Sequence, residues 1–208
     1  MISKSQLAIV LSRLKKNEKP KAKLEQYMTE SGIAADILWL FYMKGMIKDK
    51  VVADFGAGNG IFGIGALLLE AKFCYFVEID KTSLAILKEN LSDFEFEGKF
   101  KIINSDVAGF ENKVNLIVQN PPFGTKVAHA DKAFLEVAVK CADDILSFHK
   151  SSTERFVRAF ARDYSFDVSG IIPVNMVLSN TMKFHKSKRK PIDVSVFWLK
   201  RKDVNKDN

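Results

Sequence analysis

Residues 51–60, Val-Val-Ala-Asp-Phe-Gly-Ala-Gly-Asn-Gly, decide the fold of this chain. They begin as a short apolar run, end in three glycines at alternate positions, and lead into a helical pattern over residues 64–70. A strand that passes through a glycine-rich turn into a helix opens the doubly wound α/β sheets, because glycine allows a tight turn against which a ligand can lie. The stretch therefore predicts an α/β fold with a ligand site at the turn.

Strand-like and helix-like stretches alternate along most of the chain. The expected strands are 51–53, 73–79, 100–104, 116–119 and 145–148, and the expected helices are 33–43, 64–70, 82–91, 132–142 and 153–164. This alternation predicts a parallel sheet with helices on both faces. Two β-rich runs, 168–178 and 192–199, follow with no helix between them and predict an antiparallel hairpin. A mostly parallel seven-stranded sheet closed by such a hairpin is the Rossmann-like architecture of the class I methyltransferases.

Composition narrows the class of protein. The 208 residues suit one domain with a short extension, and the net charge of +7 favours a polyanionic partner. Neither a signal peptide nor an apolar run of about 20 residues is present, so we expect a cytoplasmic protein with no membrane span. Cys74 and Cys141 stand in apolar surroundings and predict free, buried thiols. With three scattered histidines they form no metal-ligand pattern.

The spacing of the turn, Asp-x-Gly-x-Gly-x-Gly over residues 54–60, departs from the Gly-x-Gly-x-x-Gly of dinucleotide sites. It suits a ligand without phosphates, and S-adenosylmethionine is such a ligand. Asp54 would hold its amino end, directly or through water. Gly56 and Gly58, with Gly60 at the start of the helix, would make room for its amino acid moiety. The alternative is a tight turn whose glycines serve packing alone.

Two further acidic residues favour the cofactor. Glu78 ends the second expected strand, about 20 residues after the turn, where such folds place a carboxylate for ribose hydroxyls. Asp106 follows the third strand and could accept a hydrogen bond from the adenine amine. Asp80 is better explained as the N-cap of the next helix. The carboxylates of Asp54, Glu78 and Asp106 thus share the carboxyl end of the sheet, where open α/β folds bind ligands.

The most specific motif is Asn120-Pro121-Pro122-Phe123, directly after the strand 116–119. Two prolines cannot continue the sheet, and they fix the chain at the strand end. The Asn120 side-chain oxygen and the Pro121 carbonyl can accept the two N–H bonds of a planar amine, while Phe123 stacks on its ring. Such acceptors free the amine lone pair for attack on a methyl group and stabilise the developing positive charge. The alternative is a rigid turn with a core phenylalanine.

From about Leu24 to Trp198 the sequence resembles the methyltransferase-like protein five family, small-subunit ribosomal RNA adenine-N6 methyltransferases of archaea and eukaryotes. The words that carry the resemblance are LEQYMT (24–29), VVADFGAGNG (51–60), NPPFGTK (120–126) with DKAFLE (131–136), and FHKSST (148–153). The resemblance implies cofactor contacts at Gln26, Thr29, Gly56, Asn59, Ile61, Glu78, Asp106 and Val107, and catalysis by Asn120, Pro121, Pro122 and Phe123. Two positions depart from the family pattern, because Met28 replaces a usual proline and Glu78 a usual aspartate.

The resemblance also completes the domain organisation. Residues 1–32 become an N-terminal helix and cofactor-covering loop, and residues 33–208 the class I S-adenosylmethionine-dependent methyltransferase domain. Asn-Pro-Pro alone leaves other planar amines open, in protein glutamine, DNA adenine or guanine N2, although Phe123 is the variant of the ribosomal family. A cofactor-binding RNA chaperone without turnover is a different class, against which the intact motif argues.

Two partners are expected. An RNA-binding face is predicted from basic positions near the carboxyl end of the sheet: Lys126, His149, Lys150, Lys183, Lys186, Lys188, Arg189 and Lys190. A solvated hairpin loop is the alternative for residues 183–190. The resemblance further implies a small zinc-binding activator protein that adds to a sheet edge, for which 100–104 is the expected edge strand.

Overall fold

The structure is a computed structural model that describes residues 2–17, 29–122, 130–177 and 191–202. The strands are β1 (Val51–Phe55), β2 (Phe73–Val77), β3 (Phe100–Ile103), β4 (Val114–Gln119), β5 (Ala142–Lys150), β6 (Phe166–Val177) and β7 (Pro191–Arg201). The α-helices are α1 (Lys4–Ser12), α2 (Ser31–Met43), α3 (Ile61–Leu68), α4 (Lys81–Ser92), α5 (Ala130–Cys141) and α6 (Glu154–Asp163). Two short 3-10 helices, η2 (Val107–Gly109) and η3 (Ser151–Thr153), follow β3 and β5.

All seven strands form one sheet in the order β3-β2-β1-β4-β5-β7-β6. The first five are parallel, and β7 runs antiparallel to both β5 and β6. The predicted seven-stranded, mostly parallel sheet with its C-terminal antiparallel hairpin is therefore confirmed. β3 lies at one edge, as expected, and β7 is inserted between β5 and β6 although it comes last in the chain.

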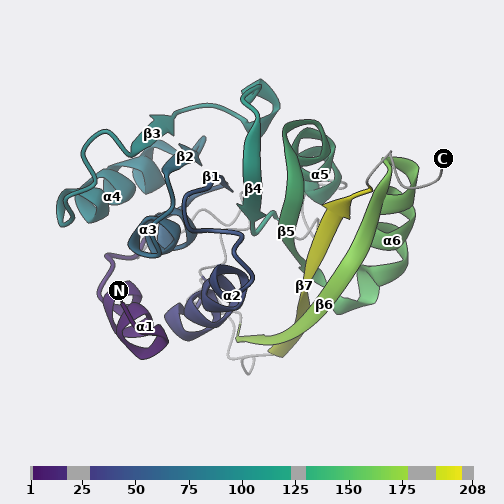
Figure 1. Cartoon of the computed structure of the whole chain (residues 1–208), viewed down its shortest axis with the longest axis horizontal. Helices are drawn as coiled ribbons and strands as arrows, with labels where there is room; N and C mark the ends of the chain where they lie inside the picture. The colour runs from purple at the N-terminus through teal and green to yellow at the C-terminus, as the bar shows by residue number, and fades with distance from the viewer. Residues whose placement is uncertain (1, 18–28, 123–129, 178–190, 203–208) are drawn as a thin grey trace, which may run out of the picture.

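The sheet separates two apolar cores, because consecutive strand residues point to opposite faces. Val52 belongs to the core beneath α1, α2, α3 and α4, whereas Ala53 belongs to the core beneath α5 and α6. Figure 1 shows the first four helices grouped toward the β1–β3 half of the molecule and α6 beside β6. Helices cover both faces of the sheet, so the side chains on both faces of the central strands are buried. This explains the nearly continuous apolar sequences of these strands.

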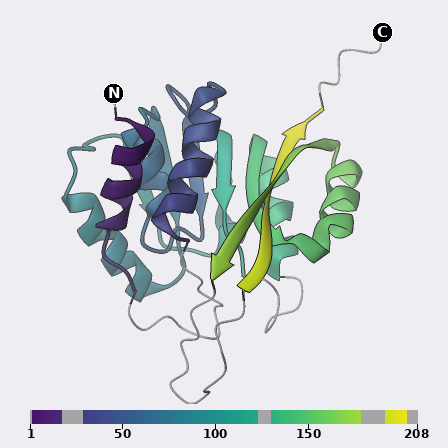
Figure 2. The ribbon, with the colours of Figure 1, turned by 90° about the horizontal axis from the view of Figure 1, so that it is seen from below.

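The N-terminal helix α1 packs beside α2 rather than standing apart (Figure 2). Its start is fixed by a capping box, in which Ser3 accepts from the Gln6 amide at 3.3 Å and Gln6 accepts from the Ser3 amide at 2.9 Å. Leu7 and Leu11 of α1 are buried in the same core as α2 and α3. This packing places the chain after α1 beside the glycine turn.

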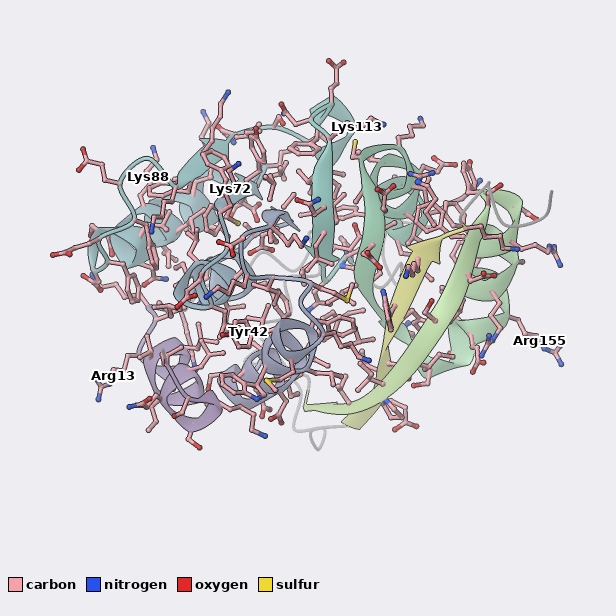
Figure 3. The ribbon with its side chains drawn as sticks, viewed as in Figure 1. Arg13, Tyr42, Lys72, Lys88, Lys113 and Arg155 are labelled. Atoms are coloured by element: carbon pink, nitrogen blue, oxygen red, sulfur yellow. The ribbon has the colours of Figure 1, made fainter. Side chains whose placement is uncertain are left out.

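Positive charge is spread around the described surface. Figure 3 shows the labelled Arg13, Lys88, Lys113 and Arg155 projecting from separate parts of the molecule. None of the described helices is long and apolar enough to cross a membrane. The described His, Cys, Asp and Glu side chains form no group of three or more that could hold a metal ion. Both cysteines are free and buried, as predicted.

Candidate active site at the carboxyl end of the sheet

The glycine turn joins β1 to α3 and is held against β2. The amides of Gly56 and Ala57 both donate to the Val77 carbonyl, at 2.9 and 3.0 Å. Gly60, the N-cap of α3, has a φ of +87°, and a Cβ at this position would lie 2.4 Å from Leu87 Cδ1. Only glycine fits this backbone and this spacing. At its three glycines the turn therefore presents backbone without side chains at the carboxyl end of β1.

Asp54 lies under this turn and is almost fully buried, with 1% of its surface exposed. Its Oδ2 accepts a hydrogen bond of 2.8 Å from the Gly63 amide in the first turn of α3. The pKa of Asp54 is raised to about 8, mainly by burial; the Gly63 hydrogen bond lowers it and the nearby Glu78 raises it. Asp54 thus stabilises the turn and carries an acidic group whose ionisation a nearby cation would favour.

Glu78, directly after β2, reaches back to the same turn. Its Oε2 accepts from the Gly58 amide at 2.8 Å, and its Oε1 accepts from the Asp80 amide at 2.7 Å. Burial also raises the pKa of Glu78 above its usual value. Each carboxylate oxygen keeps a further lone pair for a donor such as a ribose hydroxyl. Asp80 itself caps α4 by accepting from the Ser83 amide at 3.2 Å, which confirms the predicted N-cap.

These two carboxylates test whether the site fits S-adenosylmethionine. Neither Asp54 nor Glu78 forms an ion pair with a cationic side chain in the part of the chain that the structure describes. Two buried acidic groups without a cation are costly, and a ligand with an ammonium, a sulfonium and hydroxyl donors would offset that cost. The residues present therefore fit the cofactor.

The ends of β2 and β3 contribute an apolar patch and its support. Ile79, next to Glu78, has 53% of its surface exposed and offers an apolar face beside the Glu78 carboxylate. Asn104 donates from Nδ2 to the carbonyls of Glu78 and Ile79, at 3.1 and 3.3 Å. Asp106 is exposed, and its Oδ1 accepts from the Ala108 amide at 2.9 Å. Neither Ile79 nor Asn104 was predicted from the sequence. The pattern that could have indicated Ile79 is an apolar residue directly after the acidic residue that ends a strand.

Asn90 of α4 ties the N-terminal segment to the glycine turn, and no sequence pattern indicated it. The side chain is fully buried. Its Oδ1 accepts from the Lys15 amide at 2.8 Å, and its Nδ2 donates to the carbonyls of Lys15 and Asn59, at 3.1 and 2.9 Å. Asn59 also donates from its own Nδ2 to the Lys15 carbonyl at 3.1 Å. One amide therefore connects the chain after α1 to the predicted cofactor contact Asn59.

The second end of the N-terminal segment meets the predicted catalytic motif. Asn120 Nδ2 donates to Thr29 Oγ1 at 3.1 Å. Thr29 and Pro121 are buried, whereas Asn120 and Pro122 are partly exposed. The structure thus brings Thr29, predicted as a cofactor contact, against the side chain predicted to bind the substrate amine.

Two other predicted cofactor contacts start short elements at the carboxyl end of the sheet. Ile61 starts α3 directly after the glycine turn, and Val107 starts η2 after β3 and is buried. Several predicted residues lie outside the described residues: Gln26, Phe123, Lys126, Lys183, Lys186, Lys188, Arg189 and Lys190. Lys150 ends β5 and is partly exposed.

The prediction that His149 contacts RNA is wrong. Its side chain is 1% exposed, with Nδ1 3.5 Å from Asp131 and Nε2 2.7 Å from Ser147. β5 lies between β4 and β7 and is covered by helices on both faces. Residues on both faces of such a strand are buried, so the His149 side chain near its end does not reach an RNA phosphate.

Comparison with known proteins assigns the site to a family. Residues 34–148 match the methyltransferase small domain. The rRNA N(6)-adenosine-methyltransferase METTL5 of Danio rerio is 33% identical over 190 residues, which cover 88% of this chain and 90% of that protein. The chain belongs to the METTL5 family. A crystal structure of a Pyrococcus horikoshii protein, 39% identical to this METTL5-family chain, covers 97% of it and 99% of that protein with a TM-score of 0.86.

The fold also occurs in more distant enzymes with the cofactor bound. The magnesium protoporphyrin IX methyltransferase of Synechocystis, crystallised with bound S-adenosylmethionine, is 13% identical and shares the fold at a TM-score of 0.61. That match covers 82% of this chain and 78% of that one. The METTL5-family chain is an S-adenosylmethionine-dependent methyltransferase.

Proposed function

We propose that this METTL5-family chain methylates the N6 amine of an adenosine in RNA, and that the RNA is small-subunit ribosomal RNA. The name of the Danio rerio relative supports the class of substrate. The resemblance of the Asn120-Pro121-Pro122-Phe123 motif to the ribosomal family supports the small subunit. An unpaired adenosine is the substrate form that such a site can reach.

The observation that carries this proposal is the hydrogen bond from Asn120 to Thr29. A side-chain amide has a donor end and an acceptor end, and Thr29 engages the donor end at 3.1 Å. The acceptor end, Oδ1, is then presented to an N–H bond of the substrate amine, and the Pro121 carbonyl takes the second. The same arrangement would repel a substrate that offers only acceptors at this position.

Positioning and electrostatics are the protein's share of the chemistry. S-adenosylmethionine supplies an electrophilic methyl group when bound. Asn120 Oδ1 and the Pro121 carbonyl stabilise positive charge as it develops on the amine, so they act mainly in the transition state. No general base is needed at the amine, because the methylated ammonium loses its proton readily to water. Asp54, Glu78, Gly56, Gly58 and Asn59 are proposed to hold the donor in line.

Residues 1–32 are proposed to cover the bound cofactor. Two contacts support this division: Lys15 is tied to Asn59 through Asn90, and Thr29 contacts Asn120. The described chain thus meets the glycine turn before residues 18–28 and the catalytic motif after them, and residues 18–28 themselves lie outside the described residues. Residues 1–32 are therefore distinguished from residues 33–208 by this proposed role and not by a break in the packing between them.

The partners follow the family. RNA phosphates are proposed to bind Lys150, which ends β5, together with Lys126 and the basic residues of 183–190, which lie outside the described residues. A small zinc-binding activator is proposed to add to the free edge of β3, where Phe73, Tyr75 and Phe100 are half-buried. Unpaired backbone on an edge strand invites such addition. A cytoplasmic location is proposed, and it agrees with the two free cysteines.

The proposal is tested with labelled S-adenosylmethionine and undermethylated small-subunit ribosomal RNA, with and without the coexpressed activator. After digestion to nucleosides we expect label in N6-methyladenosine, and its loss in Asn120→Ala with cofactor affinity retained. Absence of label from RNA under both conditions, with cofactor binding intact, would contradict the proposal. Parallel reactions with DNA and with protein then identify another planar amine as the acceptor.

A further inference from the structure

Four polar side chains, three of them buried and Asp131 partly exposed, form a connected chain on the α5 side of the sheet, next to the catalytic motif. Asp131 Oδ2 lies 3.5 Å from His149 Nδ1, His149 Nε2 lies 2.7 Å from Ser147 Oγ, and Gln119 Nε2 donates to Ser147 Oγ at 2.9 Å. Gln119 and Ser147 are fully buried, and they are paired opposite each other on β4 and β5. We refer to Asp131, His149, Ser147 and Gln119 as the polar relay.

When the His149 ring is neutral, one set of donor and acceptor roles satisfies every hydrogen bond of the polar relay. The hydrogen bond from His149 lowers the pKa of Asp131, so this carboxylate is ionised and only accepts. His149 Nδ1 therefore carries the proton that faces Asp131. In the neutral ring Nε2 must then accept, and the Ser147 hydroxyl donates to it. The remaining oxygen lone pairs of Ser147 accept from Gln119, so all donors point toward Asp131.

The polar relay connects the two ends of the segment that holds the methyl acceptor. Gln119 is the last residue of β4 and immediately precedes Asn120. Asp131 lies in the first turn of α5, at the other end of the segment 120–130. His149 and Ser147 join them through β5, a central strand. The separation of the two ends of this segment is therefore set by side chains as well as by the strand and the helix.

The order Asp-His-Ser also occurs in hydrolases, but this serine cannot be a nucleophile. Ser147 is fully buried, and its hydroxyl oxygen already contacts Gln119 and His149. Gln119 Oε1 has no hydrogen-bond partner among the described residues, so Ser147 alone sets the orientation of the Gln119 amide. Polar groups at these positions cost more to bury than apolar ones would, and they specify geometry in return.

We propose that the polar relay is a positioning device for methyl transfer, which holds Asn120 and the Pro121 carbonyl at the angle that the substrate amine requires. His149, Ser147 and Asp131 are positioning residues, because none of them reaches the reacting atoms. This inference rests on the proposed role of Asn120 as the amine acceptor. Displacing a reacting group by about an ångström can lower a rate a hundredfold, so loss of the polar relay is expected to lower kcat.

The test compares two buried serines in neighbouring strands. Ser147→Ala removes the centre of the polar relay. Ser195→Ala, in β7, removes a buried hydroxyl that lies 2.9 Å from the Ser151 hydroxyl and is not part of the polar relay. We expect Ser147→Ala to lower kcat about tenfold with an unchanged Kd for S-adenosylmethionine, and Ser195→Ala to change kcat less than about twofold. Equal kcat in the two variants would overturn the proposal.

A double-mutant cycle adds a readout that general destabilisation does not move. Asp131→Asn and Ser147→Ala act on one network, so their effects on kcat are expected to be less than multiplicative. Effects that multiply fully would show that the two residues act separately and would overturn the proposal. Asp131→Asn keeps an acceptor for His149 and should retain more activity than Asp131→Ala.

Two measurements do not depend on the acceptor substrate. Nitrogen NMR of the His149 ring is expected to show the proton on Nδ1 in the wild type, and a shifted Nε2 signal in Ser147→Ala but not in Ser195→Ala. Amide hydrogen exchange over residues 116–120 and 131–135 is expected to accelerate in Ser147→Ala only. If wild-type protein fails to methylate RNA while both signatures appear, the proposed function fails and the polar relay stands. If neither signature appears, the polar relay fails regardless of the substrate.

Discussion

Thr29 and Asn120 are separated by 91 positions in the chain, yet the Asn120 amide donates to the Thr29 hydroxyl at 3.1 Å. The contact joins a residue of the predicted cofactor-covering segment to the residue proposed to bind the substrate amine. If both proposed roles hold, this hydrogen bond links the cover over the cofactor to the orientation of Asn120. Thr29 acts on the orientation of Asn120 whether or not it also contacts the cofactor.

Replacing Thr29 by valine keeps the size of the side chain and removes the acceptor for Asn120 Nδ2. The amide can then rotate, and we expect kcat to fall about tenfold, the effect of losing one oriented group near the reaction. Thr29→Ser retains the hydroxyl and should restore most of the rate. Steady-state kinetics with calorimetric cofactor binding check this. A rate loss that Thr29→Ser shares in full would show that the methyl group, not the hydroxyl, matters.

The stability of the protein is expected to fall as the pH rises from about 4 to about 8. Burial raises the pKa of Asp54 from 3.8 to about 8, so the folded state keeps a proton over a range in which the unfolded state has lost it. The raised pKa of Glu78 acts in the same direction. The change amounts to several kcal/mol, on the order of 1.4 kcal/mol for each pKa unit.

Urea denaturation between pH 5 and pH 8 measures this dependence. Asp54→Asn keeps an oxygen for the Gly63 amide and should flatten most of the slope. A cationic ligand near Asp54 should release protons on binding at neutral pH, which calorimetry in buffers of different ionisation enthalpy detects. A wild-type slope that survives in Asp54→Asn would assign the effect to another group.

Removing the Asn90 side chain is expected to loosen the link between the N-terminal segment and the turn. Asn90→Ala leaves the Lys15 amide and the carbonyls of Lys15 and Asn59 without these partners, at a cost of about 3 kcal/mol of stability. Cofactor affinity should fall about tenfold, because Asn59 is released. Ser92→Ala, an exposed change in α4, serves as the control and should stay within about 0.5 kcal/mol. Chemical denaturation and calorimetry give both quantities.

Two glycines separate backbone strain from steric overlap. Gly98 has a φ of +72° and open space around its Cβ position, so Gly98→Ala should cost about 1 kcal/mol through strain alone. Gly60 has a φ of +87°, and a Cβ there would lie 2.4 Å from Leu87 Cδ1 and 3.0 Å from Ile64 Cδ1. Gly60→Ala should therefore cost about 3 kcal/mol and weaken cofactor binding. Similar melting temperatures for both variants would show that Leu87 moves aside.

Most of the fold could be predicted from the sequence because its patterns are local. Apolar runs indicated β1 and β2, helical patterns indicated α4 and α6, and the absence of a helix between the last two β-rich runs indicated the hairpin. Strand lengths were less accurate. β5 extends from Ala142 to Lys150, beyond the predicted 145–148, because Asp144 and Lys150 pair with β7 and need not be apolar to belong to the sheet.

Site residues were predictable where a residue type at a given position has one common role. They were not predictable where the role depends on tertiary contacts. Acids at strand ends and the Asn-Pro-Pro motif indicate their chemistry directly. Asn90 looks like any polar residue of an amphipathic helix until the N-terminal segment covers it. His149, followed by Lys150, looks like a basic surface pair. Its burial follows only from the position of β5 between two other strands, which no local pattern reveals.

The insertion of β7 between β5 and β6 has a consequence for how the nascent chain matures. β6 emerges from the ribosome before β7, but among the described strands it pairs with β7 alone. Until residue 201 has been synthesised, the edge of β5 that will pair with β7 is unpaired. The strands therefore cannot join the sheet in the order in which they are synthesised. The last strand must enter between two elements that are already made, so contacts distant in sequence control the final step of folding. The unfinished edge is then exposed to other chains for as long as translation lasts.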